Sequence, residues 1–364
     1  MSKAAELAKW GEVSTNGQVS GRRNIIINGA MQVAQRATSA TNPGGGYNTL
    51  DRWRFSQNTS GLGNFTAEKS TDVPSGEGFK SSLKMTNGSA KTISTDMTCF
   101  IETKFEGQDV QQLKYGTSSA ENVTLSFYVR SSVTGTFCCH LFQEGNNKAH
   151  VKEYTISSAN TFEKKTLTFT GDTATSLAND NTSELRIGWI LGSGTGSHIS
   201  ADSWISGLSD KGYCTSNQTN WITTDGATFY ITGVQLEVGS VATPFEHRSY
   251  GEELALCQRY YFQKINGDGQ PVGIGTYISS GQIRTYIDFP VEMRADPSIV
   301  TSSGTAHFNI ENPSDDFDGG WVIVQINKTS AVPYATGSVS GTTSYSGIIR
   351  SKSADSRLAF NSEL

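Results

Sequence analysis

Charged residues, proline and cysteine are all scarce in this sequence. Of its 364 residues only 17% are Asp, Glu, Lys or Arg, and there are 8 prolines and 5 cysteines. The net charge of -5 creates no global field that favours nucleic acid or an anionic membrane. No apolar run approaches the roughly 20 residues of a membrane helix, and we expect no secretion signal in Met1–Trp10. We therefore predict neither nucleic-acid binding nor membrane insertion.

Motifs of catalysis and metal binding are missing as well. The five histidines are scattered without partners at ligand spacing, and there is no nucleophile elbow. The acidic cluster within residues 314–321 lacks the spacing of a calcium loop, so a solvated turn is favoured. The cysteines fit buried thiols of a protein made in a reducing cytoplasm, with Cys138 and Cys139 on opposite faces of a strand. We predict no catalytic residue, no metal site and no cofactor.

Turn-forming residues and aromatics are abundant, and together they indicate an all-β protein. The sequence has 38 glycines, is rich in Ser, Thr and Asn, and is 10% aromatic. Residues 123–130 alternate, with apolar side chains on one face and Thr124, Ser126, Tyr128 and Arg130 on the other. Many short strands with Gly/Asn turns, and no alternation with helices, favour an antiparallel β-sandwich or jelly roll. Gly233 is expected to form a bulge, and residues 266–269 a hairpin turn.

Composition divides the chain into three parts. Residues 1–24 combine a short helix at Ser2–Trp10 with a Gly/Ser-rich linker, which fits either an attachment segment or a frayed terminus. Residues 25–250 form the large sandwich domain. Residues 251–364, which start within a short helical pattern at 250–257, form a second, smaller β-sandwich domain.

Two tryptophans are the candidate ligand-binding residues. Trp53, Trp189 and Trp321 lie in apolar patterns and are expected in the core. Trp204 and Trp221 lie in polar, Gly/Ser-rich surroundings, where an aromatic face can be presented to a sugar.

Three stretches resemble a known module. Residues 24–36 (NIIINGAMQVAQR) lead into 47–53 (YNTLDRW), and residues 233–259 (GVQLEVGSVATPFEHRSYGEELALCQR) close the large domain. Such blocks bracket a jelly roll, similar to carbohydrate-binding modules, in virion proteins of tailed bacteriophages, notably tail fibres and receptor-binding proteins of marine and cyanobacterial phages. Residues 289–297 (FPVEMRADP) more weakly resemble an element of phage fibre C-terminal domains.

The closing block also has a physical interpretation as a corner of the fold. Thr243-Pro244 is expected to turn the chain after the last strand. Phe245 and Tyr250 are expected to plug the end of the sandwich, and Arg248 to pair with Glu237 or Glu246. These roles hold the fold together and bind no ligand.

The resemblance implies a virion structural protein without enzymatic activity. It would be a short tail fibre or spike that adsorbs to host-surface polysaccharide, assembled in the bacterial host cytoplasm as a homotrimer. Residues 1–24 would attach it to other tail or baseplate proteins. The alternatives are a capsid decoration protein or a baseplate or tail connector without glycan binding, and, least favoured, a polysaccharide depolymerase. Trp204 and Trp221 remain the candidate ligand contacts.

Overall fold

The computed structural model describes residues 23–58, 64–208, 212–311 and 314–364. It is nearly all β, as predicted, and divides into two compact units. The sandwich unit ends at Tyr250 and also includes Leu364, and the C-terminal unit comprises Gly251–Glu363. The expected helix at Ser2–Trp10 lies outside the described residues. In the described part of the chain no helix is both apolar and long enough to cross a bilayer.

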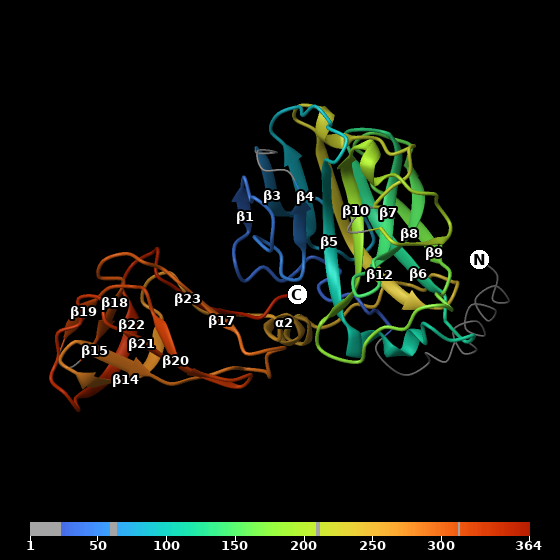
Figure 1. Ribbon diagram of the computed structural model, residues 1–364. Coiled ribbons are helices and arrows are strands. Elements are labelled where there is room, and N and C mark those ends of the chain that lie inside the picture. Colours follow the sequence, from blue (N-terminus) through green and yellow to red (C-terminus); the bar gives the residue numbers. More distant parts are fainter. Residues whose placement is uncertain (1–22, 59–63, 209–211, 312–313) are drawn as a thin grey trace. The chain divides into compact units, whose positions relative to one another are not determined.

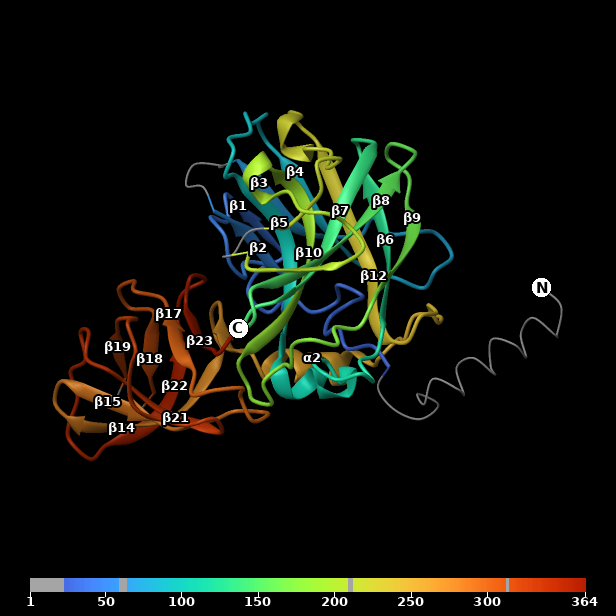
Figure 2. The same ribbon diagram turned by 45° about the vertical axis from the view of Figure 1, so that its right-hand side comes forward.

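Two six-stranded antiparallel sheets face each other in the sandwich unit (Figures 1 and 2). Sheet A has the order β1 (Ser39–Thr41), β3 (Phe65–Ser70), β4 (Ser82–Asn87), β12 (Thr228–Val238), β6 (Val123–Ser131), β9 (Glu163–Phe169). Sheet B has the order β11 (Trp204–Ser206), β8 (Lys148–Ile156), β7 (Gly135–Gln143), β10 (Ser183–Ser193), β5 (Thr98–Glu106), β2 (Arg54–Gln57). Short 3₁₀ helices occur at η1 (Gly107–Leu113), η2 (Thr195–Ser197) and η3 (Trp221–Thr223).

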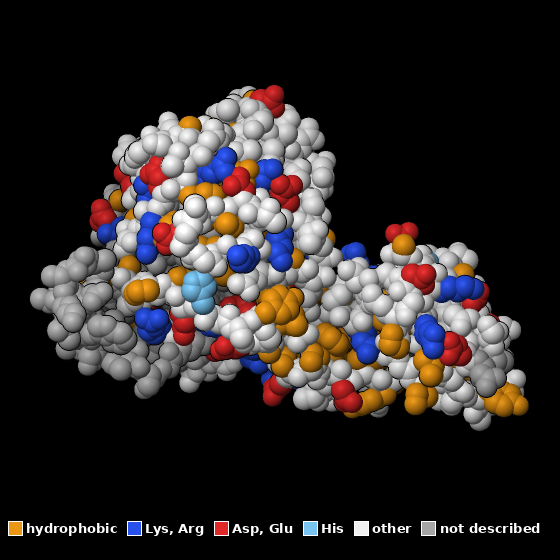
Figure 3. Space-filling view, turned by 180° about the vertical axis from the view of Figure 1, so that it is seen from behind, with side chains coloured by type: hydrophobic (Ala, Val, Ile, Leu, Met, Phe, Trp, Pro, Cys, Tyr) orange, Lys and Arg blue, Asp and Glu red, His pale blue; other side chains and the backbone are white. Residues whose placement is uncertain are grey.

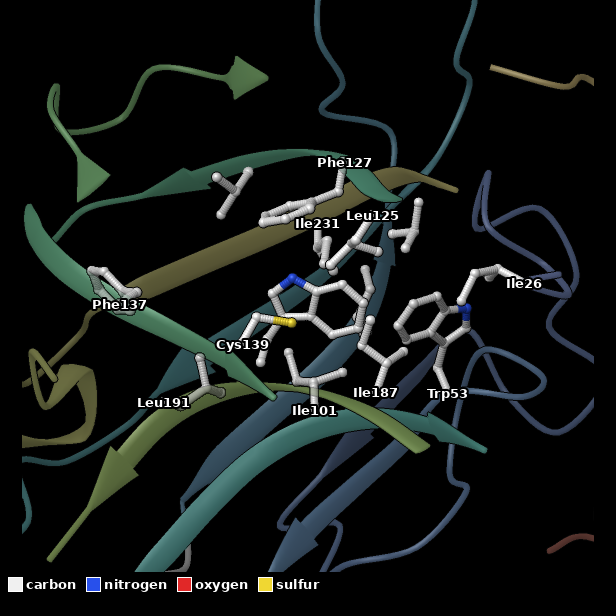
Figure 4. Close-up of a cluster of buried hydrophobic side chains, with 14 of the residues drawn as sticks. Ile26, Trp53, Ile101, Leu125, Phe127, Phe137, Cys139, Ile187, Leu191 and Ile231 are labelled. Carbon is white, nitrogen blue, oxygen red and sulfur yellow. The ribbon is translucent and has the colours of Figure 1, made fainter. Parts of the chain in front are cut away.

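The core of the sandwich lies between the two sheets. In β6 the alternating apolar residues are fully buried, whereas Tyr128 and Arg130 lie on the outer face, as the pattern predicts. In Figure 4, Leu125, Phe127 and Ile231 of sheet A lie on one side of the cluster, and Ile101, Ile187 and Leu191 of sheet B lie on the other. Trp53 and Trp189 are buried in this core, as expected, with their ring centroids 5.6 Å apart. Burial of such large aromatic side chains contributes strongly to stability.

The outer faces of the two sheets differ in their cover. On sheet B, side chains of the segment after β10, including Leu208, Tyr213 and Cys214, pack over Cys138 and Phe142 in a second apolar cluster. Cys139 points the other way into the main core, so the adjacent cysteines do occupy opposite faces. All five cysteines are buried thiols. On sheet A, the outer face bears polar and aromatic side chains.

The opening and closing sequence blocks interlock through hydrogen bonds. The side chain of Asn24 donates to the Val234 carbonyl and accepts from the backbone N–H of Leu236 at 3.1 Å. Arg248 donates to the Ile26 carbonyl at 3.0 Å and lies 3.6 Å from Glu246, one of its two expected partners. The two blocks are therefore one structural element, although about 200 residues separate them.

Helix α2 (Tyr250–Gln258) is followed along the chain by the two antiparallel sheets of the C-terminal unit. The small sheet is β13 (Tyr261–Asn266), β23 (Arg357–Asn361), β17 (Ser298–Thr301). The large sheet is β16 (Ile287–Asp288), β21 (Ser330–Ala335), β15 (Gln282–Thr285), β14 (Pro271–Ser279), β22 (Ser346–Ser351), β18 (Phe308–Ile310), β19 (Asp315–Phe317), with β20 (Val322–Ile326) pairing β21. Trp321 is buried in its core, as expected.

The expected hairpin at residues 266–269 is wrong. Strands β13 and β14 flank this turn, but β13 pairs with β23 and β14 pairs with β15 and β22. The turn chemistry is present, and the chain uses it to pass from one sheet to the other. The expectation that Tyr250 plugs the sandwich end also needs correction, because its side chain is 56% exposed.

Candidate functional site

The structure places Trp221 in the core, which corrects its assignment as a ligand contact. Its side chain is fully buried at η3, and its ring stacks on Phe65 with the centroids 6.1 Å apart. The polar residues around it in the sequence suggested a surface position. Because the ring has no exposed face, it cannot present one to a sugar in this conformation.

Trp204 lies on the edge strand β11 of sheet B, and its ring is half-buried. Its indole N–H donates to the Thr170 carbonyl at 2.8 Å, and His150 and Tyr115 contact it edge-on. The Lys148 ammonium lies 5.8 Å from the ring centroid. Trp204 and Trp221 therefore do not form one surface, and a ligand role for Trp204 stays a prediction.

A better-formed candidate is a groove on the outer face of sheet A. It has a volume of about 420 Å³ and opens to solvent, within the range of small-ligand sites. Strands β6, β9 and β12 provide its floor, and the segment after β12 provides a wall. The residues that line this aromatic groove are Glu77, Phe79, Ser126, Tyr128, Lys164, Gly233, Val241, Ala242, Thr243, Pro244, Phe245 and His247.

The predicted bulge at Gly233 shapes the floor of the aromatic groove. Gly233 has φ +61°, and the register of β12 against β6 shifts between Thr232 and Gln235. A Cβ added at Gly233 would lie 2.5 Å from the Phe79 ring, so only glycine lets that ring approach the strand. Phe79 in turn contacts Tyr128, with ring centroids 5.6 Å apart. The bulge therefore fixes the position of the central aromatic ring.

The closing sequence block builds the wall of the groove. Glu237, which is buried at the end of β12, accepts hydrogen bonds from the Thr243 backbone N–H at 2.8 Å and from its hydroxyl at 2.6 Å. The Phe245 ring contacts the Phe79 ring edge-on, with the ring centroids 5.0 Å apart. The ring centroid of the exposed His247 lies 4.9 Å from that of Phe245. The sequence block interpreted as a structural corner therefore also delivers aromatic side chains to the groove.

One charged group lies at the hydroxyl end of the Tyr128 ring, and another lies over the ring. Burial, followed by the hydrogen bond and charge of the Glu77 carboxylate, raises the pKa of Tyr128, so its hydroxyl stays protonated and donates to Glu77. The Lys164 ammonium lies 5.7 Å from the centroid of the same ring. The groove thus combines an oriented aromatic face with a carboxylate, an ammonium and the hydroxyl of Ser126.

The groove could not be predicted from the sequence, because its residues come from four separate segments. The alternation in residues 123–130 does assign Tyr128 to the outer face, and Gly233 was expected as a bulge. The remaining link, the contact of Phe79 with Gly233, joins residues more than 150 positions apart. A sequence pattern carries no signal for such a contact.

Other clusters of the described residues have structural explanations. Asp315 accepts hydrogen bonds from the Tyr277 hydroxyl and the Ser340 backbone N–H, both at 2.9 Å, and forms part of β19. Asp318 likewise accepts from Ser338 at 2.7 Å. Across the described ranges, no three His, Cys, Asp or Glu side chains are grouped as a metal site. A second hollow beside Glu153, of about 550 Å³, has no Phe, Tyr or Trp side chain in its lining.

Figure 3 shows basic and acidic side chains interspersed over the face of the sandwich unit in view, together with an exposed histidine. Neither sign of charge dominates that face. This distribution lacks the extended basic surface that nucleic-acid binding needs, and it gives no support to nucleic acid as the ligand of the unit.

Comparison with known proteins gives no family assignment. No family model matches the sequence, and no curated protein matches it. Among solved structures, the enzymatically active domain of tailspike protein 4 from bacteriophage CBA120 is similar over 59% of this chain and 21% of its own, with 13% identity and a TM-score of 0.33. The module TmCBM61, solved with β-1,4-galactotriose, is similar over 60% of this chain and 99% of its own, with 10% identity and a TM-score of 0.29.

A family 11 carbohydrate-binding module from Clostridium thermocellum is similar over 53% of this chain and 91% of its own, with 10% identity and a TM-score of 0.26. Of the tailspike domain described above, the chain spans about a fifth of the length. Similarities at these TM-scores carry no argument about function, which has to come from the groove itself.

Proposed function

We propose that the sandwich unit binds glycans in the aromatic groove. The observation that carries this proposal is the arrangement of the half-buried rings of Tyr128 and Phe245 around the buried Phe79, next to hydroxyl and charged side chains that line the same hollow. A sugar ring has an apolar C–H face, which packs on aromatic rings, and hydroxyls around its rim, which need polar partners. The groove supplies both kinds of contact within one hollow.

The proposed biological setting is a phage virion, where the chain acts as a short tail fibre or spike. This part of the proposal rests on the resemblance of residues 24–53 and 233–259 to virion proteins. Single sugar contacts are weak, and several copies on one particle would raise the avidity by about 10²–10⁴-fold where the geometry permits. Binding without catalysis is sufficient for such adsorption.

Replacing Tyr128 with alanine tests the binding site. We expect the variant to lose about ten- to a hundredfold in affinity for a bound polysaccharide, because a central aromatic anchor is removed. Affinity electrophoresis of the full chain would measure this loss of affinity, with a panel of dextran, laminarin, β-galactan, polygalacturonate, alginate and hyaluronate. The exposed Tyr286, in the C-terminal unit, provides a matched control.

The same panel with Trp204→Ala separates the two candidate sites. If Trp204→Ala abolishes binding and Tyr128→Ala leaves it intact, the groove is not the glycan site. Circular dichroism would show that each variant is folded.

The C-terminal unit supports a role in protein contacts. Ile274 of β14 and Ile348 of β22 are direct cross-strand partners on the outer face of the large sheet, and they are 71% and 44% exposed. Tyr286 and Val322 add to the exposed apolar side chains of this unit. Such a concentration favours burial against protein, either in the expected homotrimer or in the alternative role of a decoration or connector protein.

Light scattering of the purified chain distinguishes these assemblies. A homotrimer gives a mass three times that of the 39.2 kDa chain. We expect this mass, and we expect Ile274→Asp to lower it, because a charge placed on the apolar face opposes burial. A monomeric wild-type chain would contradict the homotrimer and favour the connector role.

A further inference from the structure

Cations on sheet A are generally paired with carboxylates. The Lys84 ammonium lies 2.6 Å from Glu68, and the Lys165 ammonium lies 2.6 Å from Glu163. Arg130 forms an ion pair with Asp72. Each of these charges is therefore neutralised by its neighbour, which limits what it offers to a ligand.

Lys164 is the cation that lines the aromatic groove, and it has no such carboxylate partner among the described residues. Lys69 of β3 also lacks an ion pair, but its ammonium donates to the Gln32 carbonyl. The Lys164 side chain is exposed on β9, directly opposite Tyr128 of β6. Its ammonium lies over the Tyr128 ring, 5.7 Å from the ring centroid. The carboxylate of the groove, Glu77, instead accepts the hydrogen bond of the Tyr128 hydroxyl.

We propose that the groove selects acidic sugars, with the carboxylate of a uronic acid or a similar sugar bound to the Lys164 ammonium. This inference rests on the proposed glycan-binding function and specifies its ligand class. An ammonium without a carboxylate partner gains a charge-assisted hydrogen bond from an anionic ligand, and no existing ion pair has to be broken. Glu77 disfavours a second negative charge near the Tyr128 hydroxyl, so the ligand carboxylate is directed to the Lys164 side.

The arrangement also defines how an acidic sugar lies in the groove. Its ring packs on the Tyr128 face, its carboxylate lies towards β9, and its hydroxyls face Ser126 and the wall formed by residues 241–247. A neutral sugar can make the ring and hydroxyl contacts but leaves the ammonium without an anionic partner. The preference for acidic sugars therefore depends on one side chain, whereas binding as such depends on the aromatic rings.

The test compares wild type, Lys164→Gln, Lys164→Arg and Lys165→Gln with the same six polysaccharides. Polygalacturonate and β-galactan form the key pair, because both are polymers of galactose-type rings and only the first has carboxylates. We expect wild type to bind polygalacturonate at least tenfold more tightly than β-galactan. Lys164→Gln should lose about ten- to a hundredfold in affinity for polygalacturonate and little for neutral chains. Lys164→Arg should retain most of the preference.

Lys165→Gln is the matched control, because it removes one positive charge from the adjacent position while leaving the groove intact. A general effect of net charge would weaken binding equally in Lys165→Gln and Lys164→Gln. Added salt should weaken polygalacturonate binding by wild type and have less effect on Lys164→Gln, because salt screens an exposed ion pair.

The outcomes separate this inference from the proposed function. If wild type binds acidic and neutral chains equally, or if Lys164→Gln matches wild type on polygalacturonate, the acidic preference is overturned. The glycan site itself survives that result as long as Tyr128→Ala abolishes the binding. If no polysaccharide of the panel binds, the proposed function fails and the acidic preference fails with it.

Discussion

Asn28→Ala is expected to lower the free energy of unfolding of the sandwich unit by about 4 kcal/mol or more. The buried Asn28 amide donates to the carbonyls of Val33 and Asp51 at 2.8 and 2.9 Å. Its side-chain oxygen accepts from the backbone N–H groups of Gln32 and Val33 at 2.8 and 3.0 Å. Alanine removes all four hydrogen bonds, and the Val33 carbonyl keeps another one, from the Asp51 N–H at 3.1 Å. Each of the other three bonds that is lost costs about 1–3 kcal/mol.

Urea unfolding of the full chain, followed by tryptophan fluorescence, measures this loss. Asn28 also has φ +58°, a left-handed conformation that alanine disfavours by about 1 kcal/mol. Asn147→Ala isolates that contribution, because Asn147 has φ +47° in an exposed turn. If Asn28→Ala and Asn147→Ala lower the free energy of unfolding by the same amount, the hydrogen bonds of Asn28 contribute little and the prediction fails.

Lys148→Met is expected to destabilise the same unit by about 3–5 kcal/mol at pH 7. The Lys148 ammonium lies 2.7 Å from both carboxylate oxygens of Asp172, and the two side chains are 6% and 3% exposed. Burial alone would raise the pKa of Asp172, but hydrogen bonds from Lys148, Thr175, Ala174 and Gln143 outweigh it and lower the pKa. Without the lysine, a negative charge stays buried with no cation beside it.

The pH dependence identifies the cause of the Lys148→Met effect. Because the penalty belongs to the ionised carboxylate, the stability difference from wild type should narrow as the pH falls below 7. Without Lys148 the pKa of Asp172 is higher than in wild type, so the variant takes up this proton at a higher pH. Adding Asp172→Leu should restore much of the loss. The exposed pair Lys114–Glu121 is the control, and Lys114→Met should cost less than about 1 kcal/mol. A difference that does not change with pH would contradict this explanation.

Local patterns in the sequence predict the strands but not their partners. The alternation in residues 123–130 gives β6 and its inward face correctly, because a period of two has a direct physical cause. The Asn-Gly turn at residues 266–269 was also real, yet it joins strands of different sheets. Pairing depends on contacts between distant segments, such as β13 with β23, and a short window of sequence does not contain them.

The tryptophans show the same limit at the candidate site. Trp53 and Trp189 lie among apolar residues and are buried, so the local environment was informative. Trp221 lies among polar residues and is nevertheless buried, because η3 turns its side chain inward against Phe65 of β3. The groove depends on tertiary proximity in the same way. Its aromatic residues can be identified singly, but the bulge at Gly233 brings them together.

The interlocked first and last blocks of the sandwich unit have a consequence for how such a unit can be reused. Because Asn24 bonds to Leu236 and Arg248 to Ile26, the chain enters and leaves the sandwich at one corner. A domain with adjacent ends can be spliced into a surface loop of an unrelated host protein without stretching the host's backbone. The corner that closes this fold therefore also suits the unit to insertion, together with its groove, into other proteins.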